Sequence, residues 1–439
     1  MTHTLKKQCA VVALAVAAAF GAAQDVAAQS GEIFMPVLVY RTGAYAPNGI
    51  PWADGYVDYI KLVNERDGGV NGIKLSFEEC ETGYATDRGV ECYERLKSKK
   101  PVLVNPLSTG ITYALTEKVA ADKIALFTTG YGRADSADGS VFAWNFPLLG
   151  TYWSAADMLV QHVAKKGSLK GKKIALVYHD SPYGKEPIRL LEEHAKKHGF
   201  EFIKLPVTHP GVEQKATWLQ VRQQRPDYVF LWGWGVMNST SIKEAIAVSY
   251  PRLQMYGVWW SSAEPDVLPA EAAGKGYNGI ALGHSDERDF PIHKDMVKFL
   301  YEKGKGTAKS KDEVGSVLYN RGMISAMLSV EAIKKAQEKH GKRVVTGEEV
   351  RWGAENLNID AAKVKALGFG DMVQPLKTSC RDHEGVRRGR IHTWDGKDWS
   401  YTSDWIEADD KFLRPLVEAS AKAYAAEKKI TPRDCSKEK

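Results

Sequence analysis

The sequence lacks clustered charge, and beyond its N-terminal stretch it has no long apolar run. Its 60 basic and 54 acidic residues leave a net charge of +6 that is spread along the chain. A nucleic-acid-binding protein would instead gather lysine, arginine and aromatic residues on one face. No later apolar stretch approaches the roughly 20 residues that span a bilayer. We therefore expect no nucleic-acid partner and no membrane-spanning helix.

Enzyme and metal motifs are missing as well. The 11 histidines form no HExxH pair, and no GxSxG turn is present. His284 and His293 lie with Asp286, Glu287 and Asp289 on a charged stretch that is more typical of solvated surface than of a metal site. Gly274–Gly279 fits GxGxxG, but the pattern predicts a strand after it where a nucleotide loop requires a helix. We expect no catalysis, no metal and no cofactor.

Cysteine is scarce, with 5 residues in the chain. Cys9 precedes an early apolar run, which leaves Cys80, Cys92, Cys380 and Cys435. An even number in an exported protein favours disulfides. A zinc site is the alternative, but no CxxC pair exists. We predict Cys80–Cys92 and Cys380–Cys435 bridges, although the spacing alone does not fix the pairing.

The N-terminus has the pattern of a cleavable signal peptide. Lys6 and Lys7 precede the apolar run Ala10–Ala23, which is too short to span a bilayer. Val26-Ala27-Ala28 then offers the small residues that a signal peptidase reads. Residues 1–28 are therefore predicted to be removed, and the mature protein is predicted to be periplasmic.

The remaining chain alternates between apolar strands and helices, which predicts an α/β fold with parallel sheets. Its 439 residues exceed one compact core. We expect two doubly wound lobes: residues 29–147 with 284–374, and residues 148–283 with 375–439. The second lobe would include a C-terminal hairpin and a last helix. Crossings near Pro147, Gly283 and Gln374 would make a three-segment hinge.

Ligands in such sheets bind beyond the carboxyl ends of the strands. The strand–turn units Pro101–Thr112 and Lys123–Asp135 end there, and Ser108, Thr109 and the amides of the following helix form a cradle for an anion. The bland alternative is that both turns only connect strands to helices, where Ser, Thr and Gly are common.

Aromatic residues also end the predicted strands. By alternation we assign Trp232 and Trp259 to the core, and Trp234 and Trp260 to the cleft. Tyr45, Tyr131 and Tyr183 end other strands in the same way. Rigid aromatic faces on both lobes would sandwich a flat or apolar ligand.

Several short motifs follow one another in a characteristic order along the chain: Arg41-Thr42-Gly43, Asp54-Gly55, Gly68–Gly72, Leu107-Ser108-Thr109, Phe127–Gly130, His179–Gly184 and Ala273–Gly279. In these the chain resembles the periplasmic substrate-binding proteins of branched-chain amino-acid ABC transporters, over nearly its whole mature length. The resemblance implies the type I periplasmic binding fold and a small solute delivered to a membrane permease. It also implies that Ser108 holds a ligand carboxylate and that Tyr183 closes over it.

Two positions depart from the amino-acid binders that the chain resembles. Gly132 stands where they carry a threonine, and Ser262 stands where they carry the acid that pairs with the ligand ammonium. Glu264 would compensate only if the turn were shifted. Because a buried ammonium without a carboxylate partner is strongly disfavoured, we predict a small, aromatic carboxylic acid as the ligand.

The candidate ligand contacts are Arg41, Tyr45, Asn48, Leu107, Ser108, Thr109, Thr129, Gly130, Tyr131, Tyr183, Trp234, Trp260, Ser262, Glu264 and Tyr319. We expect a monomer. Three alternatives stay open: an amino-acid or amide binder that uses Glu264, a periplasmic ligand-sensing module, and, as the weakest, an enzyme.

Overall fold

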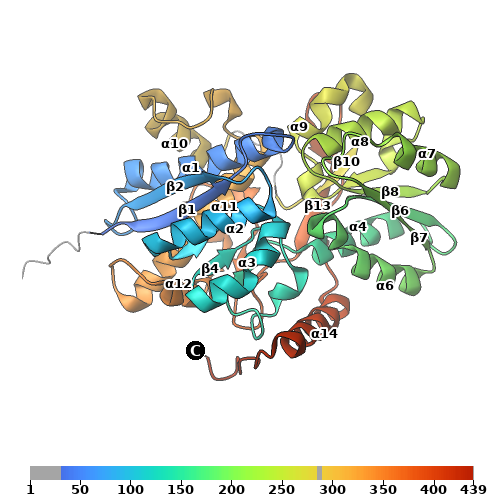
Figure 1. Cartoon of the computed structure of the whole chain (residues 1–439). Coiled ribbons are helices and arrows are strands. Elements are labelled where there is room, and N and C mark those ends of the chain that lie inside the picture. The colour runs from blue at the N-terminus through green and yellow to red at the C-terminus, as the bar shows by residue number, and fades with distance from the viewer. Residues whose placement is uncertain (1–30, 284–288, 439) are drawn as a thin grey trace, which may run out of the picture.

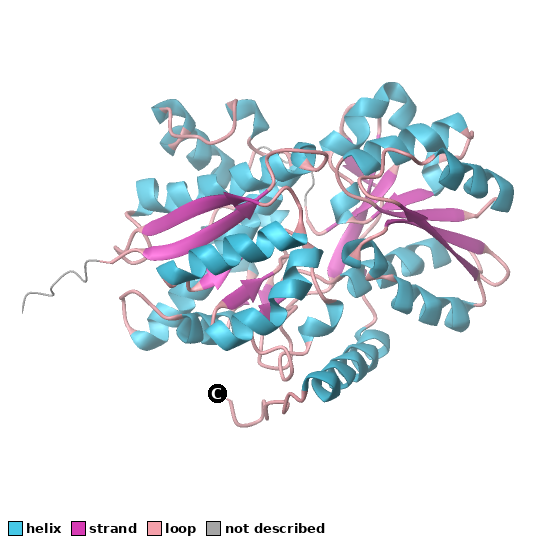
Figure 2. Ribbon diagram, in the orientation of Figure 1, coloured by secondary structure: helices cyan, strands magenta, loops and turns pink. Residues whose placement is uncertain are grey.

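The computed structural model describes residues 31–283 and 289–438, and the predicted signal peptide lies outside the described residues. Two α/β lobes lie side by side, with helices on both faces of each sheet (Figures 1 and 2). The predicted fold class is confirmed. Among the described residues, no helix combines the length and apolar character needed to cross a membrane.

The first lobe is built on parallel strands in the order β2-β1-β3-β4-β5, in which a bridge between Val37 and Asn105 joins the two halves. The strands are β1 (Ile33–Val39), β2 (Leu75–Glu81), β3 (Leu103–Val104), β4 (Ala125–Phe127) and β5 (Asn145–Phe146). The helices of this lobe are α1 (Ala46–Asp67), α2 (Thr86–Leu96), α3 (Thr109–Asp122), α10 (Pro291–Phe299), α11 (Val317–His340), α12 (Gly347–Glu355) and α13 (Ala361–Ala366).

Helices α1 and α11 cross at backbone contact. A Cβ on Gly55 would lie 2.0 Å from the carbonyl oxygen of Tyr319, and one on Gly322 would lie 1.9 Å from that of Trp52. Only glycine fits both positions, so these residues allow α1 and α11 to approach one another this closely. Helix α1 begins at Ala46, and Pro51 lies inside it.

The second lobe contains a larger sheet in the order β14-β13-β10-β9-β8-β6-β7, with β15 paired to β13. Its strands are β6 (Lys173–His179), β7 (Glu201–Val207), β8 (Tyr228–Trp232), β9 (Met255–Gly257), β10 (Asn278–Ala281), β13 (Arg388–Trp394), β14 (Trp399–Tyr401) and β15 (Ile406–Glu407). Strands β6 to β10 are parallel, and β13 joins them antiparallel to β10. The helices are α4 (Tyr152–Ala164), α5 (Pro182–Lys185), α6 (Ile188–His198), α7 (Lys215–Gln224), α8 (Val236–Ala247) and α9 (Glu264–Val267).

The C-terminal segment contacts both lobes. The predicted hairpin is present as β13–β14, with Trp394 opposite Trp399. Before it, β12 (Leu376–Lys377) pairs with β11 (Asn358–Ile359), and the chain joins the second sheet after β12. The residue-by-residue division into lobes stays a prediction.

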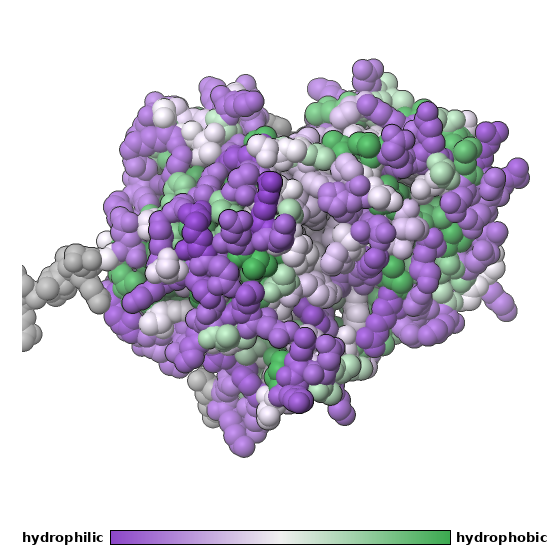
Figure 3. All heavy atoms as spheres, in the orientation of Figure 1, coloured by the Kyte–Doolittle hydropathy of each residue, from purple (hydrophilic) through white to green (hydrophobic). Residues whose placement is uncertain are grey.

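The last helix, α14 (Asp410–Lys428), runs below both lobes (Figure 1). The ring of Phe412 lies 4.6 Å from that of His194 in the second lobe, and Tyr424 stacks on Phe142, just before β5, at 4.8 Å. Both predicted disulfides, Cys80–Cys92 and Cys380–Cys435, are present, and the second ties the tail to the segment after β12. Hydrophilic side chains cover most of the visible face, and hydrophobic ones appear only in small separate groups (Figure 3).

Candidate functional site

A pocket between the lobes is lined mainly by aromatic side chains, and we call it the aromatic pocket. It encloses about 240 Å³ not filled by protein atoms. Its lining residues are Tyr40, Tyr84, Leu107, Ser108, Thr109, Tyr131, Tyr152, Tyr183, Trp234 and Trp260. Most of them follow the carboxyl ends of parallel strands of both lobes, where ligands of α/β proteins bind.

The turn after β3 is held rigidly. The side chain of Ser108 caps α3 and accepts a hydrogen bond from the amide of Ile111 at 3.3 Å. The amide of Leu107 donates to the hydroxyl of Tyr131 at 2.8 Å, and that hydroxyl donates to Asn105. The turn and the helix start are therefore positioned before any ligand arrives.

Two polar atoms at the pocket form no well-aligned hydrogen bond among the described residues, although they lie close to one another. They are the hydroxyl of Tyr40 and the indole nitrogen of Trp234, and both are buried. Burial raises the pKa of Tyr40 well above its ordinary value, so the hydroxyl keeps its proton. Buried donors without partners are rare and costly, because each has given up its water. A ligand oxygen in the pocket would accept from both.

Tyr152 and Tyr183 form the wall of the pocket on the second lobe. Their rings lie 5.2 Å apart, and the Tyr183 hydroxyl donates to the carbonyl of Gly233 at 2.8 Å. The Tyr152 hydroxyl lies 3.4 Å from the side-chain oxygen of Thr109 on the first lobe. The aromatic faces therefore meet the polar turn across the cleft.

The lobes are closed on one another. The indole nitrogens of Trp259 and Trp260 both donate to the carbonyl of Gly130, at 2.6 and 2.7 Å. A carbonyl oxygen has two lone pairs, and both are used here. The turn after β4 therefore presents no free acceptor at Gly130 for a ligand ammonium.

Further contacts hold the closed form beside the pocket. The hydroxyl of Tyr45 lies 2.7 Å from a ring nitrogen of His179 and 2.7 Å from one of His209. Burial lowers the pKa of His179 to about 4, so its ring is neutral near pH 7. Asn48 donates to Asp266 at 3.0 Å. Tyr45 and Asn48 thus hold the second lobe and do not line the pocket.

The carboxylates nearest to the predicted amine position are engaged elsewhere. Glu264 accepts from the amide of Val317 at 3.0 Å, and Ser262 is fully buried against backbone carbonyls. Asp266 accepts from Asn48, Asn238 and a backbone amide, and burial raises its pKa to about 6. No acidic residue lines the aromatic pocket among the described residues.

The structure brings part of the predicted site together. Leu107, Ser108, Thr109, Tyr131, Tyr183, Trp234 and Trp260 line the aromatic pocket. Arg41, Tyr45, Asn48, Thr129, Gly130, Ser262, Glu264 and Tyr319 lie outside its lining. Of these, Arg41 pairs with Asp54 and Glu79, and Tyr319 donates to Asp58.

Tyr40, Tyr84 and Tyr152 line the pocket but were not predicted. Tyr40 directly follows β1, so the rule that pointed to Tyr131 and Tyr183 was able to find it. Tyr84 precedes α2 and Tyr152 opens α4, and nothing in their local sequence separates them from core tyrosines.

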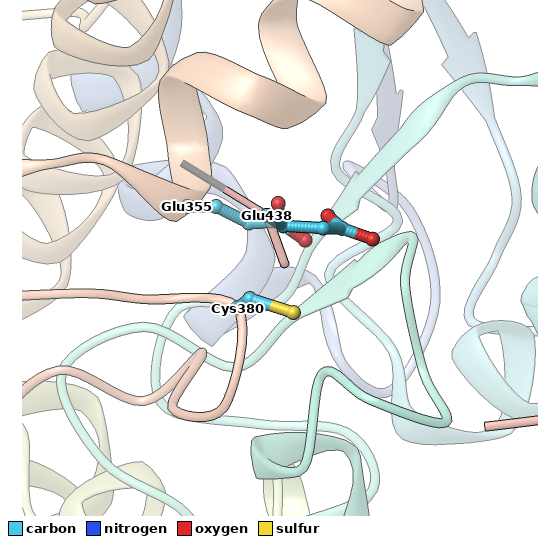
Figure 4. Close-up of side chains that lie close together, drawn as sticks. All are labelled: Glu355, Cys380 and Glu438. Carbon is cyan, nitrogen blue, oxygen red and sulfur yellow. The ribbon is translucent and has the colours of Figure 1, made fainter. Parts of the chain in front are cut away.

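One group of side chains has metal-like spacing within the described ranges: Glu355, Cys380 and Glu438 (Figure 4). The sulfur of Cys380 is bonded to Cys435 and is no thiolate ligand. Glu355 is bound by Arg433 and lies 3.2 Å from the ring of His383, which holds its pKa near 2. The group anchors the C-terminal tail and does not suit zinc.

Comparisons with known proteins agree on the fold. A family model described as periplasmic binding protein matches residues 32–398. A crystal structure described as an ABC transporter permease from the Pseudomonas fluorescens group is 45% identical, with 92% of this chain and 99% of that chain covered and a TM-score of 0.85. No curated protein matches the chain.

Two more distant structures carry ligands. A branched chain amino acid ABC transporter protein from Thermus thermophilus with bound valine is 20% identical over 88% of this chain and 98% of its own, with a TM-score of 0.74. A solute binding protein from R. palustris in complex with benzoate is 17% identical over 87% of this chain and 98% of its own, with a TM-score of 0.66. At these identities the likeness concerns the fold alone.

Proposed function

We infer the ligand from the premise that this chain belongs to the periplasmic binding protein family. The chain is a solute-binding protein of the ABC transporter type and not an enzyme. We propose that it captures a small aromatic carboxylic acid between its lobes and presents it to a membrane permease. We also propose that it works as a monomer in the periplasm, which the predicted signal peptide and the two disulfides support.

One observation carries the proposed ligand: the aromatic pocket offers hydrogen-bond donors but no acidic group. The hydroxyl of Tyr40 and the indole of Trp234 suit the oxygens of a carboxylate. Ser108 and the amides that open α3 add the positive end of a helix dipole.

An ammonium has no comparable partner in the pocket. The carbonyl of Gly130 already accepts two indole hydrogen bonds, and Glu264 is bound to the start of α11. Removing an ammonium from water without a carboxylate costs several kcal/mol. Benzoate and valine in two structures of this fold show that it accommodates both ligand classes, so the lining must select between them.

The test compares a ligand with and without its amine. We expect 3-phenylpropionate and 4-hydroxycinnamate to bind more tightly than phenylalanine, by about a hundredfold or ~2.7 kcal/mol, in calorimetric titrations. Tight binding of phenylalanine or leucine with no binding of the acids would overturn the proposal. Abolition of that binding by Glu264→Gln would then assign the amine to Glu264.

The role of Ser108 has a matched control. Ser108→Ala removes the cap of α3 together with the proposed carboxylate contact, whereas Thr346→Ala removes the cap of α12, away from the pocket. Each change should lower the free energy of unfolding by about 1 kcal/mol. Only Ser108→Ala should weaken binding of 4-hydroxycinnamate, and an equal affinity in both variants would remove Ser108 from the site.

A further inference from the structure

A second pocket lies behind Trp260, and we call it the hinge pocket. The space between its lining atoms, including the part open to solvent, is about 530 Å³. Its walls come from the connections after β5 and β10, from the segment before β12 and from the first turns of α11. The lining residues are Thr129, Leu149, Trp260, Ala281, Leu282, Gly283, Val317, Asn320, Arg321, Ile324, Met372 and Val373.

The charged member of this lining is Arg321 on α11. One of its nitrogens donates to the carbonyl of Trp259 across the lobes, and its guanidinium lies 5.3 Å from the centre of the Trp260 ring. It forms no ion pair within the part of the chain that the structure describes. A guanidinium carries five N–H donors. Most of the hydrogen-bonding capacity of Arg321 is therefore unused by the protein.

The environment of Arg321 favours an anion over water. Burial lowers the pKa of Arg321 to about 10, which leaves it charged at neutral pH. A partly desolvated charge is costly unless it is paired. The acidic residues around it are committed: Glu264 to the amide of Val317, and Asp266 to Asn48 and Asn238. His392, also close, is kept neutral by burial and by Arg321.

We propose that the hinge pocket is a binding site, separate from the aromatic pocket, for a small carboxylate with an aliphatic body. Arg321 would hold the carboxylate through a planar, two-point contact, the geometry in which guanidinium groups recognise carboxylates. The aliphatic part would contact Leu149, Leu282, Val317, Ile324 and Val373. The site goes beyond the proposed ligand of the aromatic pocket and does not depend on it.

Both lobes contribute walls to the hinge pocket. Thr129 and α11 come from the first lobe and Trp260 from the second, so closure completes the walls. An alternative role for Arg321 is to clamp Trp259 and Trp260 without any ligand. The two roles predict different results for a simple aliphatic acid such as pentanoate: it should bind through Arg321 in the first case and not in the second.

The experiment titrates the full-length mature protein with pentanoate and, as a neutral match, with 1-pentanol, by calorimetry. We expect pentanoate to bind and 1-pentanol to bind at least about tenfold more weakly. Arg321→Met should lower pentanoate affinity at least about tenfold, and Arg321→Lys should restore part of it, because the charge remains. Arg222→Met, at an exposed arginine on α7, should bind pentanoate like the native protein.

A competition measurement separates the hinge pocket from the aromatic pocket. Saturating 4-hydroxycinnamate should leave a full equivalent of pentanoate binding, and displacement would place both acids in one pocket and overturn the proposal. Equal pentanoate affinity in Arg321→Met and native protein would also overturn it, in favour of a clamp. If 4-hydroxycinnamate fails to bind while pentanoate binds through Arg321, the hinge site stands and the proposed function fails. If Arg321→Met does not fold, Ile324→Phe, which fills the pocket and keeps the arginine, should abolish pentanoate binding.

Discussion

The two pockets that meet at Trp260 offer opposite chemistry to the same kind of ligand. The aromatic pocket has tyrosine, tryptophan and serine donors and no charged lining residue, whereas the hinge pocket has one guanidinium among aliphatic side chains. Neutral donors bind through geometry, and leaving them without a partner in an empty site costs less free energy than leaving a charge there. A charged donor binds an anion more strongly, but holding it out of water costs more free energy. Under the two proposals, neutral donors among aromatic rings select the acid in the first pocket, and a guanidinium selects it in the second.

Trp260→Ala should remove the difference between the two pockets, because this side chain is the wall between them. The side chain is 5% exposed, donates to Gly130 and packs edge-on against Tyr131 and Trp234. We expect a loss of about 3–5 kcal/mol in the free energy of unfolding, measured by urea denaturation. Binding of 4-hydroxycinnamate should fall by more than about a hundredfold.

The control for this change is Trp405→Ala, which removes a half-buried tryptophan that contacts Arg388 and Arg390 on the second lobe. It should leave both ligands bound as before. If Trp260→Ala binds 4-hydroxycinnamate as the native protein does, Trp260 is no wall of the ligand site.

Tyr40→Phe tests whether the Tyr40 hydroxyl is a ligand donor in the aromatic pocket. It removes a buried hydroxyl that forms no well-aligned hydrogen bond among the described residues. Stability without ligand should therefore stay equal or rise, while affinity for 4-hydroxycinnamate should fall by about 1–2 kcal/mol, or roughly five- to thirtyfold. Unchanged or higher stability in thermal unfolding together with lower affinity in calorimetry would identify the hydroxyl as a ligand donor. A loss of both stability and affinity would instead show that the hydroxyl has a structural role.

The pH dependence of the two pockets should differ slightly. Burial raises the pKa of Asp266 to about 6, and its carboxylate lies near Arg321. The folded protein holds this proton more tightly than the unfolded chain, so the contribution of Asp266 to stability falls as pH rises from about 4 through 6.

As pH drops from 8 to 5.5, protonation of Asp266 should strengthen pentanoate binding by about two- to threefold, since it removes a competing negative charge. Binding of 4-hydroxycinnamate should change less. Asp266→Asn should abolish the difference, as measured by titrations at several pH values. Pentanoate affinity that weakens as pH drops would contradict this electrostatic account.

The α/β class and the strand ends were predictable, because buried parallel strands leave continuous apolar runs that stop at polar turns. The turn at Ser108 follows from such a run directly, and so do Tyr131, Tyr183 and Trp234. The even number of cysteines likewise predicted disulfides, whereas the pairing, Cys80–Cys92 and Cys380–Cys435, is shown by the structure. These features depend on neighbours within one segment or on simple counting.

Pairings between the lobes were decided only by the tertiary structure. Nothing near Gly130 in the chain shows that the indoles of Trp259 and Trp260, from the other lobe, occupy its carbonyl. Nor does the sequence show that Glu264 caps the start of α11 or that Arg321 on that helix lies beside Trp260. The physical reason is that local patterning specifies which face of an element is buried, whereas partners across a closed cleft depend on how two lobes pack, and no single segment encodes that.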